Sequence, residues 1–102
     1  MEHIALTETT YYTLLSLYKP LHGYGIMQRA AELSGGRVRL AAGTLYGALN
    51  ALVEKGWITL LPGEGRKKEY RLTPRGLEIL KKELARLREL VTGGDMVLKE
   101  EV

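Results

Sequence analysis

One β-hairpin is predicted in a chain whose other regular segments all show helical spacing. Residues 57–61 (WITLL) are expected to form the first strand, residues 62–65 (PGEG) the turn and residues 67–72 (KKEYRL) the return strand. Side chains on the return strand alternate between two faces. One face carries Lys68, Tyr70 and Leu72, and the other carries Lys67, Glu69 and Arg71. The hairpin therefore favours a helical domain with one small β-ribbon.

Three helices are predicted before the hairpin, because their apolar residues recur at the spacing of one helical face. Capping and stopping residues set their bounds: Thr7 to about Tyr18, ended by Pro20; Gly23 to about Ser34, ended by Gly35 and Gly36; and Ala42 to Gly56. The inner faces hold Tyr11, Leu14, Leu15 and Tyr18, then Ile26, Met27, Ala30 and Leu33, then Leu45, Leu49 and Leu52. A very short strand is expected at residues 38–40.

A fourth helix is predicted after the hairpin. Thr73 is a candidate N-cap and Pro74 suits the first helical position. The helix should run to about Val91 and end at Gly93 and Gly94, leaving a mobile tail that either docks on a dimer or remains free. Its apolar residues are spaced 3, 4, 3, 4, which is a heptad seam typical of helix pairing: Leu77, Leu80, Leu84, Leu87 and Val91.

The order of these elements predicts a winged helix-turn-helix, a mainly α fold with a small β-hairpin, followed by a C-terminal dimerisation helix. A length of 102 residues supports one such domain. We expect the DNA-binding domain in residues 1–73, the dimerisation helix in 74–92 and a flexible tail in 93–102. Pairing with a second copy would help a domain this small to be stable.

Positive charge is concentrated in the hairpin. The net charge of the chain is only +3, yet residues 66–75 hold five basic side chains and one acidic side chain. Such a local excess attracts a polyanion. Most charged turns are only solvated, but the hairpin context and the missing counter-charge favour contact with double-stranded DNA.

The third helix supplies the candidate recognition surface, because its leucines occupy the opposite face. A helix fits the DNA major groove, and glycines let its backbone approach closely. The candidates on this helix are Gly43, Thr44, Tyr46, Gly47 and Asn50. The wing adds Arg66, Lys67 and Lys68, and flanking segments add Tyr24 and Arg39. Tyr24 is expected in a core position with its hydroxyl near DNA or the next helix, and Tyr46 could instead be a half-buried packing residue.

Four short motifs resemble the PadR-type transcriptional regulators. They occur in the order and spacing of that family and span roughly residues 7–91: LHGYGI at 21–26, GTLYGAL at 43–49, EKGWI at 54–58 and YRLTPRG at 70–76. The resemblance is to the short branch of the family, which has a single C-terminal helix. Together the four matches are specific, whereas each alone would be weak.

The resemblance implies a homodimeric repressor whose dimer contacts come from the first and last helices. On this chain those contacts are Leu14 and Leu17 together with the seam residues of the last helix. Some members of the family respond to small aromatic or amphipathic ligands, so the resemblance leaves an effector open. No residue of the sequence assigns one, although Trp57 could be either a core residue or a stacking platform for a ligand.

Other classes of function are disfavoured. The chain has no cysteine, and His3 and His22 are far apart, so neither a metal site nor a cofactor is expected. No catalytic constellation is present, and Ser16 and Ser34 have no evident base. No apolar run is long enough for a membrane span, and the acidic start is unlike a signal peptide, which favours the cytoplasm. The alternative is a winged helix that binds proteins instead of DNA, for which the basic wing would be unnecessary.

Overall fold

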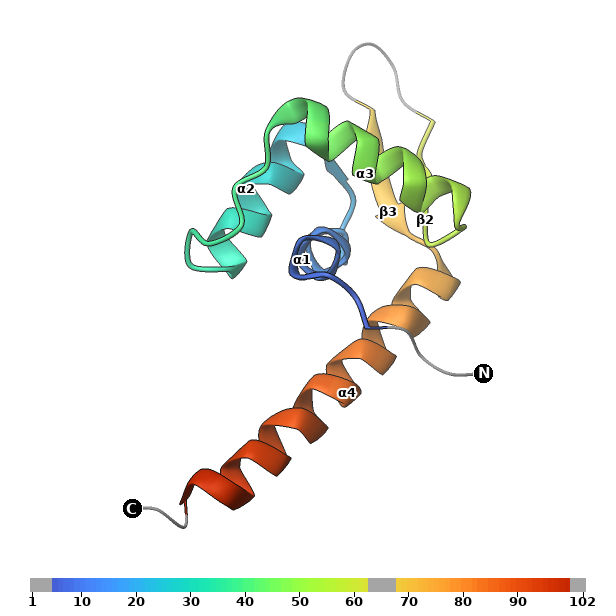
Figure 1. Cartoon of the computed structure of the whole chain (residues 1–102). Helices are drawn as coiled ribbons and strands as arrows, with labels where there is room; N and C mark the ends of the chain where they lie inside the picture. Colours follow the sequence, from blue (N-terminus) through green and yellow to red (C-terminus); the bar gives the residue numbers. More distant parts are fainter. Residues whose placement is uncertain (1–4, 63–67, 100–102) are drawn as a thin grey trace.

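The computed structural model describes residues 5–62 and 68–99. Within these residues it contains four helices and three strands, α1 (Glu8–Ser16), β1 (Leu21–His22), α2 (Gly23–Leu33), α3 (Ala42–Glu54), β2 (Ile58–Leu60), β3 (Glu69–Leu72) and α4 (Pro74–Leu98). Figure 1 shows α1, α2 and α3 grouped together, with the sheet beside α3 and α4 leaving the group as a long arm. This arrangement confirms the predicted winged helix-turn-helix with an additional C-terminal helix.

The sheet has three antiparallel strands in the order β1-β3-β2. The predicted hairpin is present, with Ile58 opposite Leu72 and Leu60 opposite Tyr70. The third strand is Leu21–His22, which pairs with β3. The prediction of a strand at residues 38–40 is wrong. The amide of Val38 bonds to the hydroxyl of Ser34 over 2.9 Å instead of joining a ladder.

The first three helices follow their predicted stop signals with one exception. Gly35, Gly36 and Gly56 have positive φ angles of 62°, 86° and 76°, the left-handed conformation that ends a helix. Thr7 caps α1 by accepting a hydrogen bond from the amide of Thr10 over 3.1 Å. However, α1 ends at Ser16 and Tyr18 is exposed, because the chain turns so that the carbonyl of Leu17 meets the amide of Leu72.

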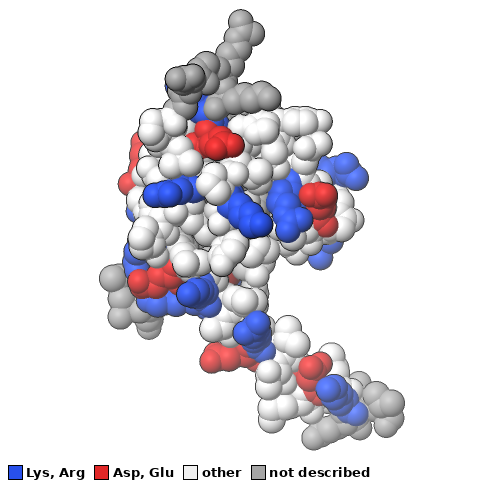
Figure 2. Space-filling view, turned by 180° about the vertical axis from the view of Figure 1, so that it is seen from behind, with Lys and Arg blue, Asp and Glu red and all other residues white. Residues whose placement is uncertain are grey.

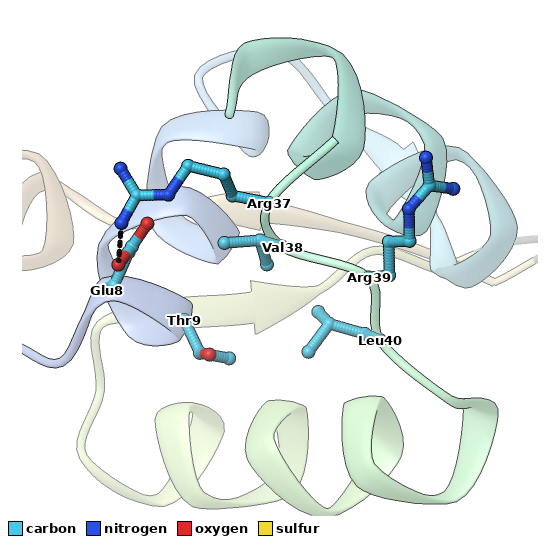
Figure 3. Close-up of a pocket in the computed structure, with 6 residues that line it drawn as sticks. All are labelled: Glu8, Thr9, Arg37, Val38, Arg39 and Leu40. Atoms are coloured by element: carbon cyan, nitrogen blue, oxygen red, sulfur yellow. Dashed lines mark hydrogen bonds and ion pairs between the residues drawn. The ribbon is translucent and has the colours of Figure 1, made fainter. Parts of the chain in front are cut away.

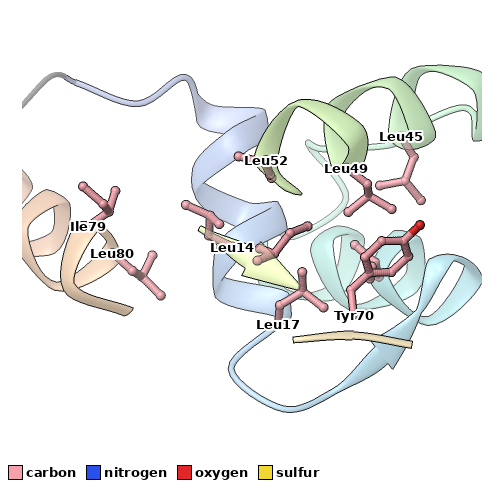
Figure 4. Packing of buried hydrophobic residues seen from close by; sticks show 10 residues of the cluster. Leu14, Leu17, Leu45, Leu49, Leu52, Tyr70, Ile79 and Leu80 are labelled. Carbon is pink, nitrogen blue, oxygen red and sulfur yellow. The ribbon is translucent and has the colours of Figure 1, made fainter. Parts of the chain in front are cut away.

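The core lies where the three helices meet the sheet and the start of α4, as Figure 4 shows. Leu14 on α1 and Leu17, the C-cap residue of that helix, are completely buried in this core. They were predicted to be dimer contacts, and this part of the prediction is wrong, since a side chain without exposed surface has nothing left to offer a partner. The remaining members of the cluster are Ile26, Leu45, Leu49, Leu52, Ile58, Tyr70, Ile79 and Leu80.

Helix α4 is longer than predicted. Gly93 and Gly94 do not end it, and the residues expected to begin a flexible tail are helical as far as Leu98. A glycine inside a helix costs only about 1 kcal/mol, and neither glycine adopts a positive φ angle here. No helix in the described part of the chain, this one of 25 residues included, is apolar enough to cross a membrane.

A buried carboxylate fixes the N-terminal segment against α4. Glu83 has 1% of its surface exposed and forms a bidentate ion pair with Arg86. The Arg86 Nε donates to Oε1 over 2.6 Å, and Nη2 donates to Oε2 over 2.9 Å. One of the Glu83 oxygens also accepts the amide N–H of Leu6 over 2.9 Å. Hydrogen bonds of this kind compensate the cost of burying a charge. Glu83 therefore helps to set the position of α4 relative to the domain.

Candidate nucleic-acid interface

The two faces of α3 differ completely in burial. Leu45, Leu49 and Leu52 lie in the core on one face. All five predicted DNA contacts of this helix are exposed on the outside: Gly43, Thr44, Tyr46, Gly47 and Asn50. In Figure 1 the helix lies across the top of the domain, next to the hairpin. The outer face of α3 is thus free to meet a macromolecule without unfolding the core.

The two glycines of this face lie in open space. A Cβ atom added to Gly43 or Gly47 would have no neighbour within 4 Å. Packing inside the protein therefore does not require glycine at either position. Each glycine also lowers the helix propensity of α3. A requirement for close backbone approach by an external partner would explain both.

Tyr46 is the large side chain of this face, and it is only half exposed, at 47%. Its ring rests on the first residue of α2: a Cβ added at Gly23 would overlap the Tyr46 hydroxyl and lie 2.9 Å from its Cζ atom. Tyr46 is therefore both a packing residue and a surface residue. On the sheet side, burial raises the pKa of Tyr70, and the nearby Tyr46 adds to that shift.

Tyr24 lies in the first turn of α2 and is 62% exposed. The expectation that it occupies a core position is wrong, because the inner face of α2 is filled by Ile26 and Ala30. Tyr24 nevertheless lies at the same end of α2 as Gly23, the residue that the Tyr46 ring covers. The structure thus brings an exposed tyrosine of α2 to the end of the helix that meets the recognition helix.

The wing presents its polar residues outward. Tyr70 is buried, whereas Lys68, Glu69 and Arg71 are exposed. The two further basic residues predicted for the wing, Arg66 and Lys67, lie outside the described residues. Figure 2 shows basic and acidic side chains interspersed over this face of the domain body and along the α4 arm.

Arg39 lies in the loop before α3 and is exposed. Its Nε donates a hydrogen bond to the carbonyl oxygen of Gly36 over 3.1 Å, which directs the guanidinium toward the turn after α2. Arg37 nearby forms an ion pair with Glu8 at 3.1 Å. These residues border a hollow of about 260 Å³ between α1 and the loop (Figure 3), and neither guanidinium points into it.

Two other sequence hypotheses concern ligands. Trp57 packs against the core cluster, and the Lys55 ammonium lies 4.8 Å from the centre of its ring. The ring is thus partly buried and contacts the protein on more than one side, which supports the interpretation of Trp57 as a core residue. Among the described residues, no group of His, Asp or Glu side chains could hold a metal ion.

The predicted seam of α4 divides into two parts. Leu80 is buried in the protomer's own core and Leu77 is half-buried. Leu87 is also half-buried, but Leu84 and Val91 are exposed, the latter at 62%. Because the helix continues to Leu98, the 3-4 spacing also continues, through Gly94 to Leu98. The exposed apolar surface therefore lies on the outer half of α4, further along than predicted.

Gly23 is a residue of this interface that sequence reasoning did not single out. Its place beneath Tyr46 depends on how α2 packs against α3, and no pattern along the chain links residues 23 and 46.

Gly76 was noted only as part of a motif. A Cβ there would overlap the carbonyl oxygen of Trp57, so α4 can begin only where a glycine lets it touch the start of the wing.

Comparison with known proteins identifies the family. The sequence profile described as "Transcriptional regulator PadR-like family" matches residues 12–82. Among curated proteins, an uncharacterised 37.1 kDa protein in transposon TN4556 of Streptomyces fradiae is 44% identical over 64 residues. The match covers 63% of this chain and 18% of that protein, so the chain spans less than a fifth of the relative's length.

Solved structures share the fold. A PadR family transcription regulator from Clostridium difficile R20291 superposes with a TM-score of 0.74 at 23% identity, covering 90% of this chain and 99% of that one. Bacillus subtilis PadR in complex with operator DNA superposes with a TM-score of 0.62 at 31% identity, covering 74% and 45%. The regulators of this family are not enzymes, in agreement with the expectation from the sequence. The chain therefore belongs to the PadR-like family of transcriptional regulators.

Proposed function

We propose that this chain is a homodimeric repressor that binds operator DNA by inserting α3 into the major groove. The observation that carries the proposal is the outer face of α3, which exposes small and hydrogen-bonding groups while all its leucines are buried. Such a surface suits a groove whose base edges present hydrogen-bonding atoms. Thr44, Tyr46 and Asn50 would contact bases or phosphates, and Gly43 and Gly47 would let the backbone approach.

The wing would contact the flanking backbone. Lys68 and Arg71 are exposed on the return strand, and Arg66 and Lys67 belong to the same basic segment of the sequence. Phosphate contacts contribute much of the affinity and position the helix without reading sequence. Tyr24 and Arg39 would add contacts at the edges of this surface. The operator complex of the Bacillus subtilis relative, 31% identical to this chain, supports DNA as the ligand.

A second copy of the chain would pair along the outer half of α4. This arm extends away from the domain in Figure 1, and Leu90, Val91, Val97 and Leu98 on it are each at least 58% exposed. Apolar surface of this extent on a single helix favours a partner. With two-fold symmetry, the recognition helices would lie about one DNA turn apart, roughly 34–36 Å.

The remaining features of the proposal rest on family membership. Residues 1–73 would form the DNA-binding domain and α4 the dimerisation helix. We place the protein in the cytoplasm, with its DNA, and give it the role of a repressor. We assign no effector.

The proposal is tested by selecting bound sequences from a random pool of double-stranded DNA with the full chain. The expected result is an inverted repeat whose half-sites are about one helical turn apart. The Lys68→Ala/Arg71→Ala variant should bind the selected sequence more weakly, and Lys99→Ala, at the far end of α4, should bind it as the wild type does. Failure to enrich any sequence, with protein that is folded, would contradict the proposal.

A further inference from the structure

The two helices of the helix-turn-helix, which share the core, also meet near the surface, where Gly23 contacts Tyr46. Gly23 begins α2 and is buried, although Tyr24 beside it is 62% exposed. A Cβ at position 23 would meet three Tyr46 atoms first: the hydroxyl oxygen, Cζ at 2.9 Å and Cε1 at 3.3 Å. The atoms that cover Gly23 are thus those of the tyrosine ring. Any side chain at position 23 would have to push this ring outward.

An added Cβ at Gly23 meets different surroundings from one at Gly25, Gly43 or Gly47. Gly43 and Gly47, on the same helix as Tyr46, have no neighbour within 4 Å of an added Cβ. At Gly25, two residues further along α2, the atom nearest to an added Cβ is at the end of the flexible Leu21 side chain, 3.2 Å away. Of these four glycines, Gly23 is the one at which a methyl group would displace part of the recognition surface.

The central strand of the sheet carries a second tyrosine, Tyr70, near Tyr46. Tyr70 lies on β3 opposite Leu60 and Leu21, with 8% of its surface exposed. Burial raises the pKa of Tyr70, and the nearby Tyr46 adds to that shift. The Tyr46 ring covers the start of α2, and about half of its surface remains on the outer face of α3.

We propose that Gly23 is a positioning residue for DNA binding, which acts by seating the Tyr46 ring in the one orientation that the bound DNA requires. The inference rests on the proposed function for its effect on DNA and on the Gly23–Tyr46 contact for its mechanism. Two motifs of the sequence, at residues 21–26 and 43–49, then meet at one side chain. Tyr46 is expected to lose little entropy on binding, because packing already holds it.

The first test concerns the free protein. Tyrosine is replaced by 3-fluorotyrosine, and the 19F resonance of Tyr46 is identified by its loss in Tyr46→Phe. In Gly23→Ala this resonance should shift and the thermal midpoint should fall, whereas Gly25→Ala should leave both nearly unchanged. If the Tyr46 resonance does not move in Gly23→Ala, the proposal is overturned, whether or not the protein binds DNA.

The second test is a double-mutant cycle on the selected operator. Gly23→Ala should weaken binding about five- to tenfold, the loss of one or two well-placed hydrogen bonds. In a Tyr46→Ala background the same substitution should change the affinity by less than about twofold, since no ring is left to displace. The Tyr46→Ala background should also restore the thermal midpoint lost in Gly23→Ala, which removes misfolding as the cause.

The outcomes separate this inference from the proposed function. If the wild type binds no DNA, the proposed function fails and the 19F measurement still decides the role of Gly23. If the wild type binds but Gly23→Ala binds equally well, the positioning role is overturned alone. An equal loss in the wild-type and Tyr46→Ala backgrounds also overturns it, because Gly23 would then act on DNA through some other group.

Discussion

The hydroxyl of Thr73 donates a hydrogen bond to the carbonyl oxygen of Gly56 over 2.6 Å. The same oxygen of Thr73 accepts the amide N–H of Gly76 over 3.0 Å, which caps α4. The Thr73 amide in turn bonds to the Trp57 carbonyl over 3.0 Å. One residue therefore ties the end of the recognition helix to the start of the helix that we propose pairs with a second copy.

Replacing Thr73 by valine keeps the shape of the side chain but removes both hydroxyl bonds. We expect the free energy of unfolding to fall by about 1–2 kcal/mol, from the lost cap and the lost hydrogen bond to Gly56. Thr73→Ser retains the hydroxyl and should lose less than about 0.5 kcal/mol. Urea unfolding measures both values. Equal stability of the serine and valine variants would show that the hydroxyl has no such role.

Gly76→Ala should be more damaging. The added Cβ overlaps the backbone carbonyl of Trp57, which cannot rotate away as a side chain could. A loss of about 3 kcal/mol is expected from this overpacking. Gly93→Ala is the matched control, because it lies in the same helix with no atom within 4 Å and should be neutral or stabilising by up to about 1 kcal/mol. A stable Gly76→Ala protein would contradict the observed packing.

The sequence predicted the fold well where local signals decide the outcome. The helix caps Thr7 and Thr73, the stops at Gly35 and Gly56 and the alternation around Tyr70 all depend on neighbours in the chain, and the structure contains them. The strand predicted at residues 38–40 was wrong because a strand needs a partner from a distant part of the chain, which local signals do not reveal. Strand pairing depends on which edge of β3 is free, and Leu21–His22 occupies the edge that β2 leaves open.

The glycines of the recognition helix provide a prediction in which two properties move in opposite directions. Gly47→Ala should stabilise the protein by about 0.5–1 kcal/mol, because alanine is the better helix former and the position is open. The same variant should bind the operator more weakly if DNA approaches the backbone there. Thermal unfolding and operator affinity are measured on the same sample. A variant that gains stability and keeps its full affinity would remove Gly47 from the interface.

Dimerisation through the outer half of α4 predicts a face-specific effect. Leu84→Glu should convert the dimer to a monomer in light scattering, because it places a charge on the apolar seam. Ala85→Glu adds the same charge to another face of the same exposed turn and should remain dimeric. Both variants should stay folded, since neither residue belongs to the core cluster. A dimer that persists in Leu84→Glu would place the interface elsewhere.

The candidate site could be predicted only in part. The exposed face of α3 followed from the leucine spacing, which fixes the buried side of any helix. The assignment of Leu14 and Leu17 to a dimer failed because an apolar face does not reveal whether its partner is the same chain or another one. Tyr24 was expected in the core, but Ile26 and Ala30 fill the inner face of its helix and Tyr24 remains exposed.

The salt dependence of operator binding by the intact chain tests the central claim most directly. If α3 and the basic wing bind the DNA backbone as proposed, the logarithm of the affinity should fall linearly with the logarithm of the salt concentration. The slope should be about −0.9 for each phosphate contact, and six to ten contacts would lower the affinity roughly 10³- to 10⁵-fold between 50 and 200 mM salt. Affinity that is insensitive to salt, or no binding at any salt concentration, would contradict the account.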